Sequence, residues 1–154
     1  MQLLLAALSG FIGAIVLTLL IYLVKVDGRY LDIPYMLGSR FVDIENRSRV
    51  YTVGLILHLL IGVFWGLLYV LTITALAIIP DWPIGILWGF AHGVFVGSMI
   101  GIIADTHPYI GKGKPIGDPG IMGQNWGTLM PYWILFIHIV FGVCTLIIYN
   151  WLAY

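Results

Sequence analysis

Four long apolar segments constrain this chain more than any other feature. They cover about residues 3–24, 50–79, 84–103 and 132–152. Each has the roughly 20 residues that an α-helix needs to cross the hydrocarbon core of a bilayer. Hydrophobic residues make up 61% of the sequence and charged residues only 9%, which is more apolar surface than one water-soluble core can bury. We therefore predict that residues 1–154 form a single all-α domain, an integral membrane four-helix bundle of up-down topology.

The basic residues lie on one side of the predicted bundle. All seven Lys and Arg residues follow the first or the third segment. The positive-inside rule then places these two long basic connections in the cytoplasm and both termini outside, in a prokaryotic cytoplasmic membrane. The lipid bilayer is the main expected partner. A net charge of zero gives no bulk field for nucleic acid, so no nucleic-acid partner is expected.

Two stretches of the chain align with each other. HLLIGVFWGLLY begins at His58 and HIVFGVCTLIIY begins at His138. Both carry glycine four residues after the histidine and end in tyrosine. The first and third segments also share a Gly-Phe pair, at Gly10 and at Gly89. These matches predict a duplicated helical hairpin whose pseudo-axis runs along the membrane normal.

Glycines recur at four-residue spacing in the second and third segments. Such small-xxx-small faces let helix backbones approach closely inside a membrane. We expect these faces to pack the bundle, and also to bind larger subunits of a membrane complex or a second copy of the chain. The glycines are Gly54, Gly62 and Gly66 in the second segment, and Gly85, Gly89, Gly93, Gly97 and Gly101 in the third.

Three of the four histidines lie inside apolar segments. A polar ring in hydrocarbon is costly unless it has a partner, so it indicates a functional site. Counting along ideal helices from the basic side places His58 about 13 Å and His138 about 10 Å deep. Two imidazoles at similar depth on diagonal, parallel helices suit the axial ligation of haem b.

Other residues complete this hypothetical haem site. Gly62 and Gly142 would leave space for the macrocycle, and Arg40, Arg47 and Arg49 would bind the propionates. The arrangement resembles the haem-binding four-helix core of membrane b-type cytochromes. It departs from the respiratory pattern, in which each ligand helix carries two histidines and the core holds two haems. The resemblance implies a haem-binding subunit of a respiratory-type electron-transfer complex rather than a stand-alone enzyme.

His92 leaves alternatives open. Together with His58 and His138 it could hold a single Cu, Zn or Fe ion. The same count places His92 about 20 Å from the basic side, a depth difference of about 7–10 Å that argues against such a site. His92 could instead bind a quinone head group. A non-redox accessory or scaffold subunit without a cofactor is the main alternative function. The fourth histidine, His107, is expected to cap the end of the third helix.

The chain as a whole resembles a family of small four-span prokaryotic membrane proteins. The resemblance depends on the glycine-rich first segment, on His58 four residues after Gly54, on His92 shortly after Gly89, and on Gly142 four residues after His138. It implies a four-span fold and supports treating the intramembrane histidines as a set. It implies no particular activity.

Overall fold

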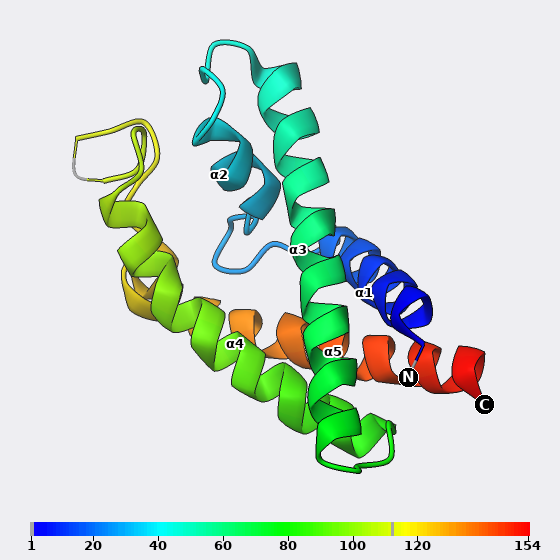
Figure 1. The fold of residues 1–154 in the computed structure, drawn as a ribbon. Helices are drawn as coiled ribbons and strands as arrows, with labels where there is room; N and C mark the ends of the chain where they lie inside the picture. Colours follow the sequence, from blue (N-terminus) through cyan, green and yellow to red (C-terminus); the bar gives the residue numbers. More distant parts are fainter. Residues whose placement is uncertain (1, 112) are drawn as a thin grey trace.

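The computed structural model describes residues 2–111 and 113–154. Four of its helices are long and apolar enough to cross a membrane: α1 (Leu3–Leu23), α3 (Arg47–Ala75), α4 (Trp82–Asp105) and α5 (Met130–Ala153). Two short helices lie in the connections, α2 (Ile33–Ser39) and the 3₁₀ helix η1 (Ile121–Trp126) (Figure 1). The described residues contain no strand, only two isolated β-bridges. The prediction of an all-α four-helix membrane bundle is confirmed.

Helix ends differ from the predicted segment ends by a few residues, because side-chain caps set them. The carboxamide of Asn46 accepts a hydrogen bond from the Arg49 backbone N–H (3.2 Å), so α3 begins before the apolar run does. The Asp81 carboxylate caps α4 in the same way by accepting from the Ile84 N–H (3.3 Å). At the end of α3, Ala77 has a positive φ of 52° and stops the helix before residue 79. Hydropathy alone does not detect such caps.

The four long helices form a ring that is open on one side. α1 packs against α3 and α5, and α5 packs against α4. α3 and α5 touch only slightly, as expected for diagonal partners. α3 and α4 follow each other in the chain, yet they make little contact and diverge from their short connection (Figure 1). The space between them is the origin of the site described below.

α2 lies against the polar end of α3. Glycines allow this close approach, because Gly38 faces the Val50 carbonyl and Gly54 faces the Pro34 carbonyl. Asp32 caps α2 through the Tyr35 N–H (3.2 Å). The same carboxylate accepts from Tyr22 Oη of α1 (2.7 Å) and Tyr51 Oη of α3 (2.5 Å). Asp32 therefore connects three helices at the polar end of the bundle.

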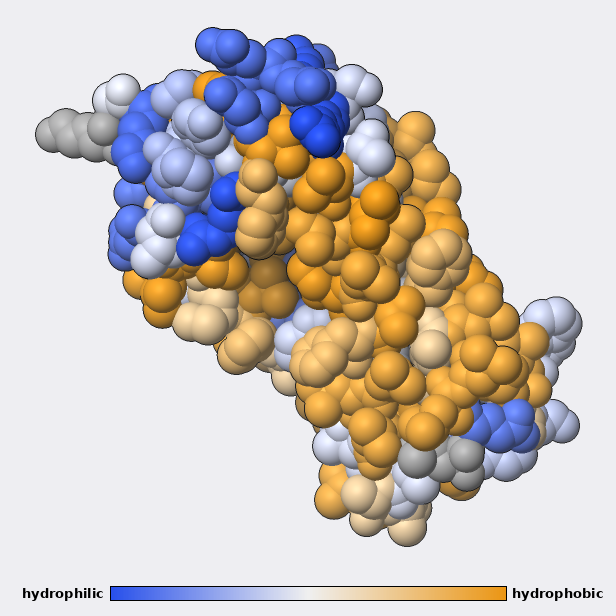
Figure 2. All heavy atoms as spheres, turned by 45° about the horizontal axis from the view of Figure 1, so that its top comes forward, coloured by the Kyte–Doolittle hydropathy of each residue, from blue (hydrophilic) through white to orange (hydrophobic). Residues whose placement is uncertain are grey.

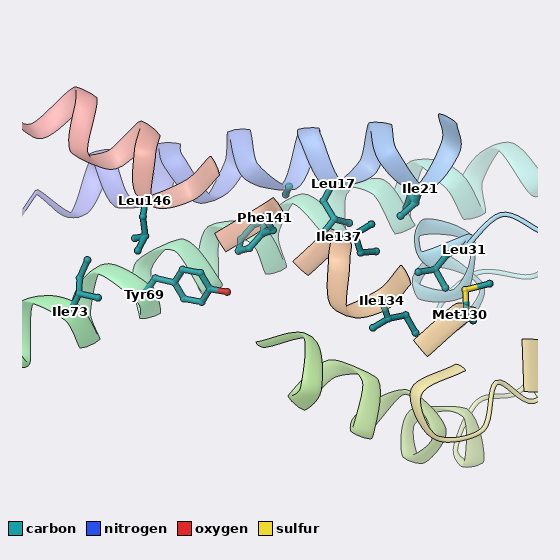
Figure 3. Close-up of a cluster of buried hydrophobic side chains, with 11 residues drawn as sticks. Leu17, Ile21, Leu31, Tyr69, Ile73, Met130, Ile134, Ile137, Phe141 and Leu146 are labelled. Atoms are coloured by element: carbon teal, nitrogen blue, oxygen red, sulfur yellow. The ribbon is translucent and has the colours of Figure 1, made fainter. Parts of the chain in front are cut away.

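The core runs along the inside of the bundle, where α1, α3 and α5 meet (Figure 3). The ring of Tyr69 lies beside Phe141, with 5.8 Å between ring centroids. Large apolar side chains also cover the outer surface of the long helices. Figure 2 shows this apolar band between a large group of hydrophilic residues at one end and a smaller group at the other. Such a surface fits a lipid bilayer. The buried side chains of the core are Ala14, Leu17, Ile21, Leu31, Tyr69, Ile73, Met130, Ile134, Ile137, Phe141 and Leu146.

The glycine faces pack helices against each other within the chain, and binding of another subunit or a second copy through them stays a prediction. A Cβ on Gly66 would lie 2.6 Å from the Gly10 Cα, and one on Gly142 would lie 2.8 Å from the Gly89 Cα. Gly97 faces the Met122 side chain of η1. Both the α1–α3 pair and the α4–α5 pair thus cross at glycines, and the internal repeat relates Gly10 of the first pair to Gly89 of the second.

Candidate functional site

One cavity of about 290 Å³ contains all three intramembrane histidines. It lies in the opening between α3 and α4, with α1 and α5 as its floor and α2 at its polar end. Figure 2 shows a hollow in the apolar surface with hydrophilic atoms inside it. The lining residues are Ala14, Leu17, Ile33, Met36, Leu37, Arg40, His58, Ile61, Gly62, Trp65, His92, Phe95, Val96, Met99, Ile100, Ile103, His107, Ile137, His138 and Phe141.

The hydrogen bonds of His58 determine its tautomer. Its Nδ1 lies 3.0 Å from Thr18 Oγ1 of α1. The Thr18 hydroxyl already donates its hydrogen to the Ala14 carbonyl (2.7 Å). The imidazole must therefore donate from Nδ1–H, which leaves Nε2 as a lone-pair acceptor. No described residue bonds to that Nε2 atom.

The tautomer of His138 is set in the same way. Its Nδ1 lies 2.7 Å from the Ile134 carbonyl one helical turn earlier. A carbonyl can only accept, so Nδ1 carries the hydrogen and Nε2 is again a free acceptor. Metal-binding histidines usually have this arrangement, in which the other ring nitrogen donates to a fixed oxygen.

His92 lies closer to the other histidines than the depth count predicted. Its ring centroid is 4.7 Å from that of His138, and the rings meet edge to face at 75°. It stacks on Trp65 of α3 at 3.8 Å, and its Nδ1 lies 3.0 Å from Tyr69 Oη. The predicted depth gap is wrong because the count assumed upright helices, whereas α4 crosses the bundle obliquely (Figure 1).

The three rings do not form a closed metal cage. Within residues 2–111 and 113–154, no group of three His, Cys, Asp or Glu side chains is arranged to hold a metal ion. No acidic side chain lines the cavity. The site therefore presents imidazole acceptors in an otherwise apolar space.

Only one of the three predicted arginines reaches the cavity. Arg40 lines its polar end, and its Nη1 donates to the Thr106 carbonyl at the end of α4 (3.0 Å). Arg47 instead lies over the ring of Tyr51, 5.6 Å from its centroid. Arg49 lines a separate surface hollow with Asp43 and Glu45. Arg47 and Arg49 therefore do not line the cavity.

The two glycines assigned to a haem slot are also engaged in packing. Gly62 lines the cavity, but a Cβ there would collide with the Ala14 side chain of α1. Gly142 lies against Gly85 and Gly89 of α4 and does not line the cavity. Gly142 therefore opens no slot, because its missing side chain is what lets α4 and α5 meet.

His107 connects α4 to α2 instead of capping α4 with its ring. Its Nε2 lies 3.0 Å from the Met36 carbonyl, and its Nδ1 accepts from the Tyr109 N–H (3.1 Å). These partners fix a neutral ring with the hydrogen on Nε2. Burial lowers the pKa of His107, the Met36 carbonyl opposes this shift, and the positive charges of Arg40 and Lys114 lower it further.

The residues that orient the histidine rings were not predicted from the sequence. Thr18 of α1 contacts the ring of His58 on α3. Tyr69 and Trp65 of α3 contact the ring of His92 on α4. The available signal was weak. Tyr69 follows His58 by three helical turns and so shares its helix face, which is the only hint that the spacing gives. The structure shows that Tyr69 is nearly fully buried (1% exposed).

Comparisons with protein-family models, with curated proteins and with solved structures gave no match for this chain. The resemblance to small four-span membrane proteins therefore stays a hypothesis. Functional inference depends on the geometry of the histidine cavity.

Proposed function

We propose that this membrane protein binds haem b through His58 and His138 and serves as a subunit of an electron-transfer complex. One observation carries the proposal: two neutral imidazoles, each held by a hydrogen bond at Nδ1, line one cavity with unpartnered Nε2 atoms. Neither Nε2 has a hydrogen-bond partner among the described residues, so each lone pair is available to a ligand. A Lewis-acidic iron would use both lone pairs.

The donor set fits this cofactor. Neutral imidazole is the form that ligates haem iron, and a hydrogen bond from Nδ1–H makes the ring a better donor. The cavity volume of about 290 Å³ is at the lower limit of the roughly 300–1,000 Å³ that ligand pockets enclose.

The chain would hold and shield the cofactor. Thr18 and the Ile134 carbonyl fix the two rings, and apolar side chains such as Phe141 exclude water. When bound, haem would supply one-electron chemistry. The basic connections support an orientation in which the polar end with α2 faces the cytoplasm of a prokaryotic cell and both termini lie outside. Larger subunits of the complex would then contact the apolar surface.

An absorption spectrum of the protein purified in mild detergent tests the proposal. After expression with a haem supply, we expect a Soret band that disappears in His58→Ala and in His138→Ala. His107→Gln is the matched control, because this histidine bonds to α2 and leaves no free acceptor in the cavity. A protein that stays colourless after reconstitution with haem would rule out the cofactor.

A single metal ion is the second candidate, and the 4.7 Å separation of the His92 and His138 rings favours it. Zinc or copper needs nitrogen ligands at about 2 Å, so His58 would have to move toward this pair. Elemental analysis distinguishes the two candidates. Stoichiometric zinc or copper that is lost in His92→Ala, without a Soret band, would select the metal ion.

A further inference from the structure

The cavity opens sideways, toward the membrane. The side chains along its rim on α3 and α4 are apolar and exposed, with Ile61 40%, Phe95 54% and Ile103 45% accessible. These residues lie within helices that are long and apolar enough to cross a membrane. α3 and α4 make little contact with each other along this side. A ligand that enters between α3 and α4 would come from the bilayer and would have to be lipophilic.

The polar end of the same cavity carries a cation. Arg40 has a single side-chain hydrogen bond among the described residues, from Nη1 to the Thr106 carbonyl. A guanidinium has five N–H donors, so most of its donor capacity is open. No Asp or Glu lines the cavity to balance the charge. The field at this end therefore favours an anionic group, and a planar carboxylate matches the guanidinium best.

We propose that the cavity selects lipophilic carboxylic acids that enter from the bilayer between α3 and α4, and that Arg40 recognises their carboxylate. The inference rests on the proposed function where the ligand is haem, whose propionates belong to this class. Arg40 is then the residue that orients the macrocycle, with its acidic edge toward α2 and the polar end of the bundle. A long-chain fatty acid carries the same carboxylate on a different apolar body.

Paired acid and ester probes test the role of Arg40. Haemin and haemin dimethyl ester, and hexadecanoic acid and its methyl ester, are titrated into the apoprotein in nanodiscs. We expect the wild-type protein to bind each acid more tightly than the corresponding methyl ester. Arg40→Gln should weaken acid binding about tenfold, the scale of one charge-assisted hydrogen bond, and leave ester binding unchanged. Arg47→Gln is the control, because Arg47 lies outside the cavity. Arg40→Lys keeps the positive charge and should retain most of the preference for the acid.

The outcomes separate this inference from the proposed function. If hexadecanoic acid binds with dependence on Arg40 and haemin does not bind, the haem proposal fails and the carboxylate site stands. If haemin binds and Arg40→Gln binds acid and ester as the wild type does, the carboxylate inference fails and the haem proposal stands. If neither acid binds to the folded wild-type protein, both fail. Circular dichroism and a single gel-filtration peak confirm that each variant is folded.

Discussion

The imidazoles of His92 and His138 lie edge to face with their ring centroids 4.7 Å apart, one on α4 and one on α5. They come together because α4 and α5 cross at Gly89 and Gly142, where no side chain keeps the backbones apart. His92 also stacks on Trp65, so its ring is held between α3 and α5. Separate substitutions of His92 and of His138 can therefore test the role of each ring.

His92→Phe distinguishes a neighbouring ring from a ligand. Phenylalanine keeps an aromatic surface against Trp65 but loses the hydrogen bond between Nδ1 and Tyr69 Oη, so we expect a loss of about 1–3 kcal/mol of unfolding free energy. If His58 and His138 are the axial ligands, His92→Phe should retain the wild-type ratio of haem to protein, whereas His138→Phe should lose the haem. The ratio is measured by pyridine haemochrome absorbance. Loss of haem in His92→Phe would assign the ligand role to His92 instead.

Gly142→Ala should destabilise the bundle. A Cβ there would lie 2.8 Å from the Gly89 Cα, and backbone atoms cannot move aside as a flexible side chain would. We expect a loss of about 1–3 kcal/mol, as for other overpacking substitutions, measured by thermal or denaturant unfolding in detergent. Gly117→Ala is the control, because no atom lies within 4 Å of its Cβ position and its stability should match the wild type. Equal stability of both variants would mean that α4 and α5 do not pack closely at Gly142.

Asp32→Asn should loosen the polar end of the bundle. The carboxylate accepts from the hydroxyls of Tyr22 and Tyr51, and an amide would turn an N–H₂ group toward one of them. The expected loss is about 1–3 kcal/mol of unfolding free energy. Asp43→Asn is the matched control, because Asp43 only accepts from the exposed Glu45 N–H. A double-mutant cycle with Tyr22→Phe should show coupling between Asp32 and Tyr22, and independent effects would argue against their hydrogen bond.

His107 should make stability depend on pH. Its pKa is lowered in the folded protein, so below about pH 6.5, the ordinary histidine value, the unfolded chain binds more protons. The free energy of unfolding should therefore fall as the pH drops below that value and should not change through His107 above it. Other histidines titrate as well, so the measurement is the difference between wild type and His107→Gln.

Glutamine at position 107 can still donate to the Met36 carbonyl but does not titrate. As the pH falls from 7.5 to 5.5, the unfolding free energy of His107→Gln should rise relative to that of the wild type. A difference that is independent of pH would show that His107 titrates alike in the folded and unfolded states. Equilibrium unfolding in detergent at the two pH values provides the comparison.

Parts of the site could be read from the sequence. The repeat around His58 and His138 predicted that these two rings belong together, and they line the same cavity. The depth count misplaced His92, because a count along one helix carries no information on how that helix tilts. Arg47 and Arg49 were assigned by proximity in sequence to α3, but the first turn of a helix points its side chains in several directions. Only Arg40, beyond the end of α2, faces the cavity.

The sequence by itself determined that four apolar helices would form and cross a membrane, because apolar length is a local property of each segment. It also placed three histidines inside these segments, where a polar ring needs a partner. The tertiary structure alone decided that α3 and α4 separate and leave a cavity. Helix crossing angles depend on contacts between distant residues, such as Gly10 with Gly66 and Gly89 with Gly142. The free acceptors likewise come from bonds that only the folded chain forms, such as that between Thr18 and His58.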